Sequence, residues 1–363
     1  MRKAFAALHE SGSGALSPSW RGGTTRQETV LHSPCRPLGR LVEAFRAVKP
    51  AVVPVLQYPD GHFMNDSTPL AYELEQRHPG ARSIIPEGEG AAFLSDLIED
   101  MADEWGTKCM FHYRWWHAAD RDFASVWVVG DRLAAQATQG APTAVRPGEA
   151  PAGSVGAMLA GLITGETLAA AEKQFNDRQV SRMALVGVTE GNKPVIEQSF
   201  HRILAAFNAG IVESTFMFGT RPSLADFGWF GQLWTLSMDP TSSSEMRGRA
   251  PRVLPWLLRL EDASGVNGAW RTGAEGVSGW VRAMLALAEE TYLPFLKANA
   301  TAIEKGHDTV SLSLPGGTYA QAPYKYQAKC YATLKSKLAA LPPQARAIVN
   351  PLLKETGCFR YLA

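Results

Sequence analysis

The fold is decided by residues 52–70, which have the sequence VVPVLQYPDGHFMNDSTPL. Two short apolar runs, at 52–57 and 62–65, flank the turn signal Asp60-Gly61 and predict two strands joined by a tight turn. Polar residues and then Pro69 follow, which predicts a helix over about 68–78. This order puts the N-terminus of a helix beside the end of a sheet, a favourable position for an anionic ligand.

Three further features of this stretch indicate a ligand site. Pro54 cannot donate a hydrogen bond within a sheet, and it keeps the preceding Val53 extended, so the Val53 backbone is available to a peptide-like ligand. Asp66 and Ser67 come at the predicted helix N-terminus, where free N–H groups and the helix dipole attract a carboxylate. The alternative interpretation is structural: a proline-capped edge strand followed by an ordinary helix cap.

Residues 43–75 resemble the second half of the thioredoxin-like domain of cytosolic glutathione S-transferases. The resemblance implies that Pro54 is a cis proline, that the Val53 backbone pairs with the cysteinyl part of glutathione, and that Asp66 and Ser67 bind the γ-glutamyl carboxylate. Residues 218–227, FGTRPSLADF, resemble the signature of the C-terminal domain of the same family. Within this signature Ser223 and Asp226 have the spacing of a capping box, which is a structural feature.

The resemblance implies an α+β, mostly α-helical fold in three parts. Residues 1–85 form a thioredoxin-like domain that is irregular before about residue 38 and whose first strand is in question. Residues 86–265 form the all-helical C-terminal domain of the family. Residues 266–363 form an extension with helices and a β-hairpin, because residues 309–314 alternate and Pro315-Gly316-Gly317 follows them. Helices are expected near 38–48, 91–118, 167–186, 193–215, 224–237, 251–262, 276–304, 324–340 and 343–355, with a loop at 137–155.

The composition is that of an ordinary soluble protein, with 45% hydrophobic and 20% charged residues. A net charge of +1 provides no basic field for nucleic acid, and no uninterrupted apolar run reaches the roughly 18 residues of a membrane helix. The four cysteines show no C-x-x-C pair and no zinc spacing, which is typical of a reducing compartment. A cytoplasmic location is therefore expected, with a transit peptide over 2–27 as the alternative. The family and the prevalence of two-fold oligomers imply a homodimer.

The catalytic residue is not identified by the sequence. In the family a Tyr, Ser or Cys at the end of the first strand stabilises the thiolate, and three arrangements are open here. In the first, residues 29–32 are the second strand and the catalytic residue is absent. In the second, residues 29–32 are the first strand, and Ser33 or Cys35 lies in the active-site turn. In the third, the turn contains Ser17. The deciding feature is whether a segment before residue 40 forms a strand beside Val53.

The expected helix over 91–118 contains the candidates for the acceptor pocket. Lys108, His112 and Trp116 are spaced by four residues and share a face, and Trp115 lies next to them. The family implies that this helix borders the pocket for the electrophile, whereas the alternative is an aromatic core with polar groups paired at an interface. No metal is expected, because no second His or carboxylate lies at ligand spacing from His112.

The hairpin and helices after residue 305 are interpreted as packing or dimer surface, with a lid formed by Tyr324, Tyr326 and Lys329 as the alternative. The resemblance implies an enzyme that conjugates reduced glutathione, its co-substrate, to an electrophilic small molecule. One alternative is a non-catalytic glutathione-binding or structural protein of the same fold. The other is a thiol transferase that depends on Cys35.

Overall fold

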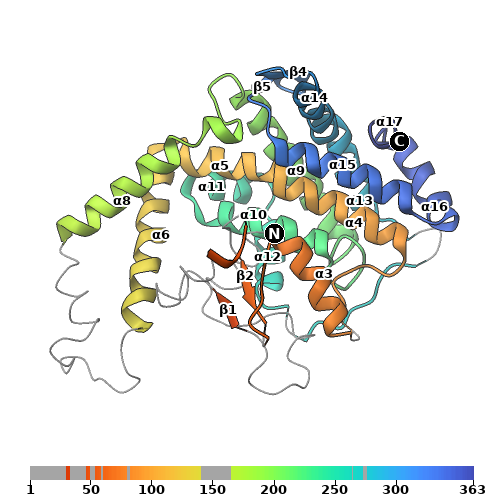
Figure 1. Ribbon diagram of the computed structural model, residues 1–363, viewed down its shortest axis with the longest axis horizontal. Helices are drawn as coiled ribbons and strands as arrows, with labels where there is room; N and C mark the ends of the chain where they lie inside the picture. The colour runs from red at the N-terminus through yellow and green to blue at the C-terminus, as the bar shows by residue number, and fades with distance from the viewer. Residues whose placement is uncertain are drawn as a thin grey trace.

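The computed structural model is mostly helical, with a small sheet on one side of a large helical body (Figure 1). It describes residues 30–32, 46–49, 54–58, 60–79, 82–139, 165–263, 265–272 and 276–363. The predicted α+β, mostly α fold class is confirmed. No helix within these ranges is long and apolar enough to cross a membrane.

The sheet contains three short antiparallel strands in the order β1-β2-β3. They are β1 (Val30–His32), β2 (Val55–Gln57) and β3 (Phe63–Asn65). The two strands predicted on either side of Asp60-Gly61 are therefore confirmed. A strand before residue 40 also pairs with β2, and its last residue, His32, lies opposite Val55. Val53 itself lies outside the described residues, so a strand beside Val53 stays a prediction.

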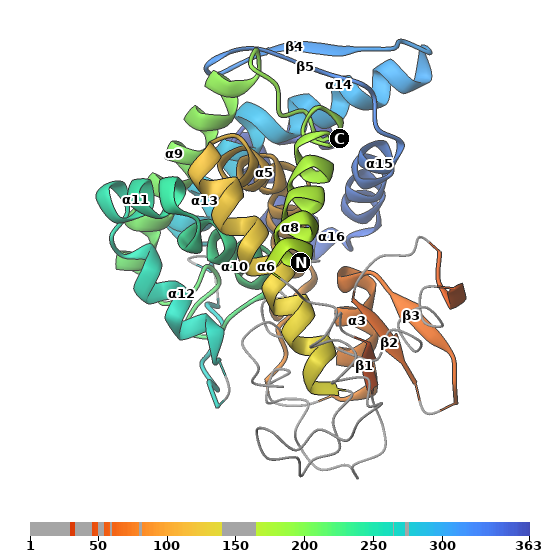
Figure 2. The same cartoon turned by 90° about the vertical axis from the view of Figure 1, so that its left-hand side faces the viewer.

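The helix predicted to follow β3 is α3 (Ser67–Arg77). Its inner face buries Leu70 and Leu74 against Leu56 and Tyr58, next to the sheet. Figure 2 shows the sheet and α3 together at one side of the helical body, away from the β4–β5 hairpin.

The long helix predicted near 91–118 is present, but a π-helical turn interrupts it. It consists of α4 (Glu89–Met101), the π segment η2 (Ala102–Gly106) and α5 (Thr107–Trp115). The backbone stays in the right-handed helical region through both junctions, so the three segments form one continuous rod. The helix α6 (Ala118–Gln139) follows at once and was not predicted.

The helical body is built around α10 (Leu224–Met238), nearly every residue of which is buried. The other elements here are α8 (Gly165–Val180), the 3-10 turn η3 (Ala184–Val186), α9 (Lys193–Glu213), α11 (Pro240–Arg249) and α12 (Val253–Glu261). The helix α11 was not predicted. The predicted capping box begins α10, since Ser223 N donates to Asp226 Oδ2 at 2.8 Å and Ser223 Oγ accepts from Asp226 N. Both residues are fully buried, so the motif stabilises the centre of the body.

The C-terminal third packs directly on this body. It comprises α13 (Gly279–Leu287), the π segment η4 (Ala288–Tyr292), α14 (Leu293–Glu304), β4 (Val310–Leu314), β5 (Gly317–Gln321), α15 (Lys325–Ala340), α16 (Pro343–Glu355) and α17 (Phe359–Leu362). The predicted hairpin is confirmed as β4 and β5. A single hydrophobic cluster runs from Ala71 to Leu362, so these elements share one core with the helices before them.

Asn192, just before α9, fastens the hairpin to the body. Its Nδ2 donates to the carbonyl oxygens of Gly187 and Ala320, both at 2.7 Å, and its Oδ1 accepts from Ala320 N at 2.9 Å. The side chain is buried, with all three hydrogen bonds in place. This amide therefore helps to fix the position of β5.

Candidate functional site

The N-terminus of α3 has the geometry of a small anion site. Asp66, at the N-cap position, has a φ of 76° and is the one described residue other than glycine with positive φ. Its side chain accepts no capping hydrogen bond from the helix, so the first amides of α3 are not satisfied by a cap. Backbone strain of this kind is costly and is concentrated at ligand sites.

Ser67 is the first residue of α3 and is fully buried. Its Oγ has no hydrogen-bond partner within the part of the chain that the structure describes. A buried hydroxyl without a partner costs roughly 1–3 kcal/mol. At the positive end of a helix, a carboxylate oxygen is the ligand group that best accepts from such a hydroxyl.

The sheet brings Pro54 to the same place. Pro54 is buried and immediately precedes β2, and Val55 lies opposite Asn65, the residue before Asp66. Pro54, Asp66 and Ser67 are therefore brought together at one edge of the sheet, as predicted. Val53, whose backbone was predicted to pair with the ligand, lies outside the described residues.

An acidic side chain of the helical body contacts Thr68, the second residue of α3. Thr68 Oγ1 donates to Glu99 Oε1 at 2.9 Å. Burial, together with the charge of Asp103, raises the pKa of Glu99 well above its usual value. The extension also reaches this end of α3, since the hydroxyl of Tyr326 in α15 donates to Asp66 Oδ2 at 3.3 Å. This place therefore combines a helix end that attracts a carboxylate with the acidic side chain of Asp66 beside it.

The catalytic candidates Ser17, Ser33 and Cys35 lie outside the described residues, as does most of the helix predicted over 38–48. The last described residue before Ser33 and Cys35 is His32, at the end of β1, and it lies opposite Val55. Of the four cysteines, Cys109, Cys330 and Cys358 are free and buried.

The four acceptor-pocket candidates have different surroundings. Lys108 is 2% exposed and donates to Val186 O at 3.1 Å and to Gln321 Oε1 at 2.8 Å, beneath the hairpin. Trp115 is buried and packs against Phe175 of α8.

The other two candidates lie together at the end of α5, where the rings of His112 and Trp116 are 5.5 Å apart. His112 Nε2 is 3.0 Å from Glu197 Oε1 of α9. His117 completes a group of three side chains whose donor atoms lie within 4.8 Å of one another. The spacing argument that found no partner for His112 missed Glu197, because that residue belongs to another helix.

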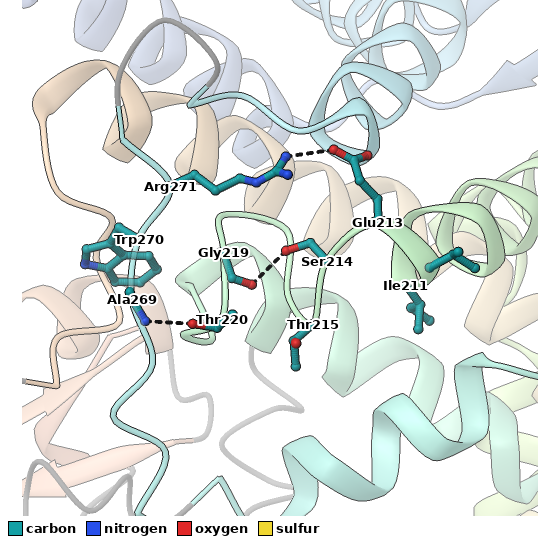
Figure 3. Close-up of a pocket in the computed structure, with 10 residues that line it drawn as sticks. Ile211, Glu213, Ser214, Thr215, Gly219, Thr220, Ala269, Trp270 and Arg271 are labelled. Carbon is teal, nitrogen blue, oxygen red and sulfur yellow. Dashed lines mark hydrogen bonds and ion pairs between the residues drawn. The ribbon is translucent and has the colours of Figure 1, made fainter.

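A separate pocket of about 440 Å³ lies at the end of α9 (Figure 3). Most of its polar side chains already have partners. Arg271 pairs with Glu213 at 2.7 Å, Ser214 Oγ donates to Gly219 O, and Thr220 Oγ1 accepts from Ala269 N. This pocket contains none of the site residues predicted from the sequence, and its mostly paired polar side chains give no indication of a ligand.

Comparison with known families supports the second of the two resemblances. Residues 168–283 match the family model described as "Glutathione S-transferase, C-terminal domain". The chain therefore contains a region that is similar to this domain, from α8 to α13, and residues 218–227 lie inside it. The match covers less than half of the chain and does not include the sheet, α3 or the hairpin. No curated protein and no solved structure matches the chain.

Proposed function

We propose that this protein binds glutathione at the N-terminus of α3 and conjugates its sulfur to an electrophilic small molecule. The observation that carries the proposal is the Ser67 hydroxyl, which is buried at a helix N-terminus and has no hydrogen-bond partner among the described residues. The glutathione S-transferase-like helical region supports the same class of function.

The charges around α3 suit the γ-glutamyl end of glutathione, which carries a carboxylate and an ammonium group. The carboxylate would accept from Ser67 Oγ and from the first amides of α3. The ammonium would lie towards the side chain of Asp66, whose described hydrogen bond is the one it accepts from the Tyr326 hydroxyl. The backbone of Val53, held by Pro54, would pair with the cysteinyl part.

Calorimetric titration with reduced glutathione, and with S-hexylglutathione as a second ligand, tests binding. Ser67→Ala is expected to weaken both ligands at least tenfold, because a hydrogen bond to a charged group contributes about 1.5–3 kcal/mol. Ser199 is the matched control, since its hydroxyl in α9 is also buried and has no described partner. Ser199→Ala should leave affinity unchanged. Absence of glutathione binding by the folded wild-type protein would refute the proposal, and so would equal affinities of wild type and Ser67→Ala.

The position of β1 favours Ser33 or Cys35 as the group that stabilises the thiolate. The strand β1 ends at His32, opposite Val55, so it ends at the same edge of the sheet where Pro54 precedes β2. The rate of conjugation of glutathione to 1-chloro-2,4-dinitrobenzene would be compared in wild type, Ser33→Ala and Cys35→Ser. A loss confined to one variant identifies the residue. Binding without conjugation in the wild type would indicate the non-catalytic alternative, and disulfide exchange lost in Cys35→Ser would indicate the thiol transferase.

We further propose a cytoplasmic homodimer with no nucleic-acid or membrane partner. Sedimentation equilibrium of the purified protein measures the oligomeric state directly.

A further inference from the structure

A second group of chemically competent side chains lies between α5 and α9, on elements that do not form the α3 site. It consists of His112 in α5, His117 in the turn before α6, and Glu197 in α9. The three donor atoms come within 4.8 Å of one another although Glu197 is 85 residues away from His112. The packing of α5 against α9 brings them together.

His112 is completely buried, and its two ring nitrogens have different surroundings. Nε2 faces Glu197 Oε1 at 3.0 Å, while no described residue hydrogen bonds to Nδ1. The ring therefore presents Nε2 to the carboxylate of Glu197, and an imidazole nitrogen in this position can coordinate a metal ion.

One donor–donor distance is already close to what a transition-metal ion requires, and the others, all within 4.8 Å, require rotation of the partly exposed side chains. Two donor atoms bound to zinc at about 2.0–2.1 Å and at a tetrahedral angle are about 3.3 Å apart. The separation of His112 Nε2 and Glu197 Oε1 is 3.0 Å, so a small rotation of Glu197 provides the space. Glu197 and His117 are partly exposed, so an ion can reach the group from solvent.

We propose that His112, His117 and Glu197 bind one divalent transition-metal ion, with zinc the best match to the ligand types. Two imidazoles and one carboxylate suit zinc, iron or nickel far better than magnesium or calcium, which prefer oxygen ligands. Three protein ligands leave at least one coordination position for water or a substrate atom. The proposal replaces the expectation of no metal that was based on spacing along one helix.

Two neighbouring residues shape this site. Trp116 packs on the His112 ring and limits its rotation. Lys193, four residues before Glu197, lies near the site, with its Nζ 5.7 Å from the centre of the Trp116 ring. Its positive charge opposes a bound cation. Lys193→Met is therefore expected to strengthen metal binding severalfold at low salt.

The test uses the full-length protein after removal of metals with a chelator. Calorimetric titration with zinc chloride, and the visible absorption of cobalt(II), should each show one site per chain. His117→Gln and Glu197→Gln should each weaken zinc binding at least tenfold. These side chains are partly exposed, so the variants should retain the circular dichroism of the wild type.

The matched control is His201→Gln. His201 also lies in α9 and also pairs with a glutamate, Glu245, at 3.2 Å, but no second histidine joins that pair. This variant should bind zinc like the wild type. Absence of stoichiometric binding in the wild type would overturn the proposal. Equal affinities in the wild type, His117→Gln and Glu197→Gln would also overturn it, because the zinc would then be bound elsewhere. The titration with glutathione does not depend on the result of the zinc titration, because the proposed glutathione site lies at the N-terminus of α3.

Discussion

Two glycine-to-alanine substitutions, both within long helices, are predicted to change stability in opposite directions. Gly210 in α9 faces α13, where the fully buried Trp280 packs against Phe207 with ring centroids 5.1 Å apart. Around Gly130 in α6, no heavy atom of the described residues lies within 4 Å of the position that a Cβ would take. Alanine raises helix propensity equally at both sites, so the difference between the variants measures packing alone.

The structure gives the size of the effect at Gly210. An added Cβ would lie 2.1 Å from Trp280 Cγ and 2.6 Å from Trp280 Cβ. Because Cβ is fixed to the backbone of α13, rotating the indole does not remove the clash, and the two helices must separate by roughly 1 Å. Overpacking costs about 1–3 kcal/mol or more, and the alanine returns about 1 kcal/mol of helix propensity. A net loss of about 2 kcal/mol is expected for Gly210→Ala, against a gain of about 0.5–1 kcal/mol for Gly130→Ala.

Urea denaturation followed by tryptophan fluorescence and by circular dichroism measures both variants. Gly210→Ala should have a lower urea midpoint than the wild type, and Gly130→Ala a slightly higher one. If Gly210→Ala were as stable as Gly130→Ala, the close contact between α9 and α13 would be wrong. A loss of stability in Gly130→Ala would show that alanine does not contribute the helix propensity assumed here.

Three other substitutions test buried polar groups. Burial lowers the pKa of Lys108 from 10.5 to about 8, so the folded protein loses this proton at a lower pH than the unfolded chain does. The free energy of unfolding should therefore rise between pH 8 and 10.5, by up to about 3 kcal/mol. Lys108→Met should remove that rise in urea midpoints measured at pH 7.5 and 9.5, and an unchanged pH dependence would contradict it. Asn192→Asp turns an oxygen towards the carbonyls of Gly187 and Ala320 and should cost about 2–4 kcal/mol in thermal denaturation, whereas Asn192→Ser should cost less. Asp226→Asn replaces a carboxylate that accepts from Met217 N and from Ser223 and should cost about 2–3 kcal/mol by the same measurement; a change below 0.5 kcal/mol would show that the capping box is dispensable.

Elements with strong local signals could be predicted from the sequence. The alternation over 310–314 and the glycines after it predict the hairpin, and Gly316 and Gly317 have φ values of 99° and 143° that other residues rarely adopt. The strands around Asp60-Gly61 and the capping box at Ser223 are local in the same sense. In each case neighbouring residues determine the structure without help from distant contacts.

The elements that were missed have weak local signals. The helix α11, PTSSSEMRGR, is almost entirely polar, and it forms because Pro240 begins it and because Ser242 and Met246 are buried against the body. The π segment η2 also has no recognised pattern in the sequence. Tertiary packing decides both features, and a single sequence does not show it.

The candidate sites divide in the same way. Pro54, Asp66 and Ser67 are near neighbours in sequence, so their convergence at the sheet edge could be predicted. Contacts between distant segments could not, as Glu197 beside His112 and Tyr326 beside Asp66 show. Helix spacing identifies which residues share a face, but it does not identify what that face meets.

The π segment η2 also bears on how this chain tolerates changes of length. A π turn holds one residue more than an α turn, so η2 is equivalent to a single-residue insertion that the helix absorbs without a loop. Deleting one residue within 102–106 would therefore restore a regular helix and leave α5 close to its present orientation relative to α4. Glu99 would remain beside α3, and His112 would remain beside Glu197. In related chains, gain or loss of one residue inside this helix is therefore compatible with keeping the α5–α9 cluster, even where every loop is the same length.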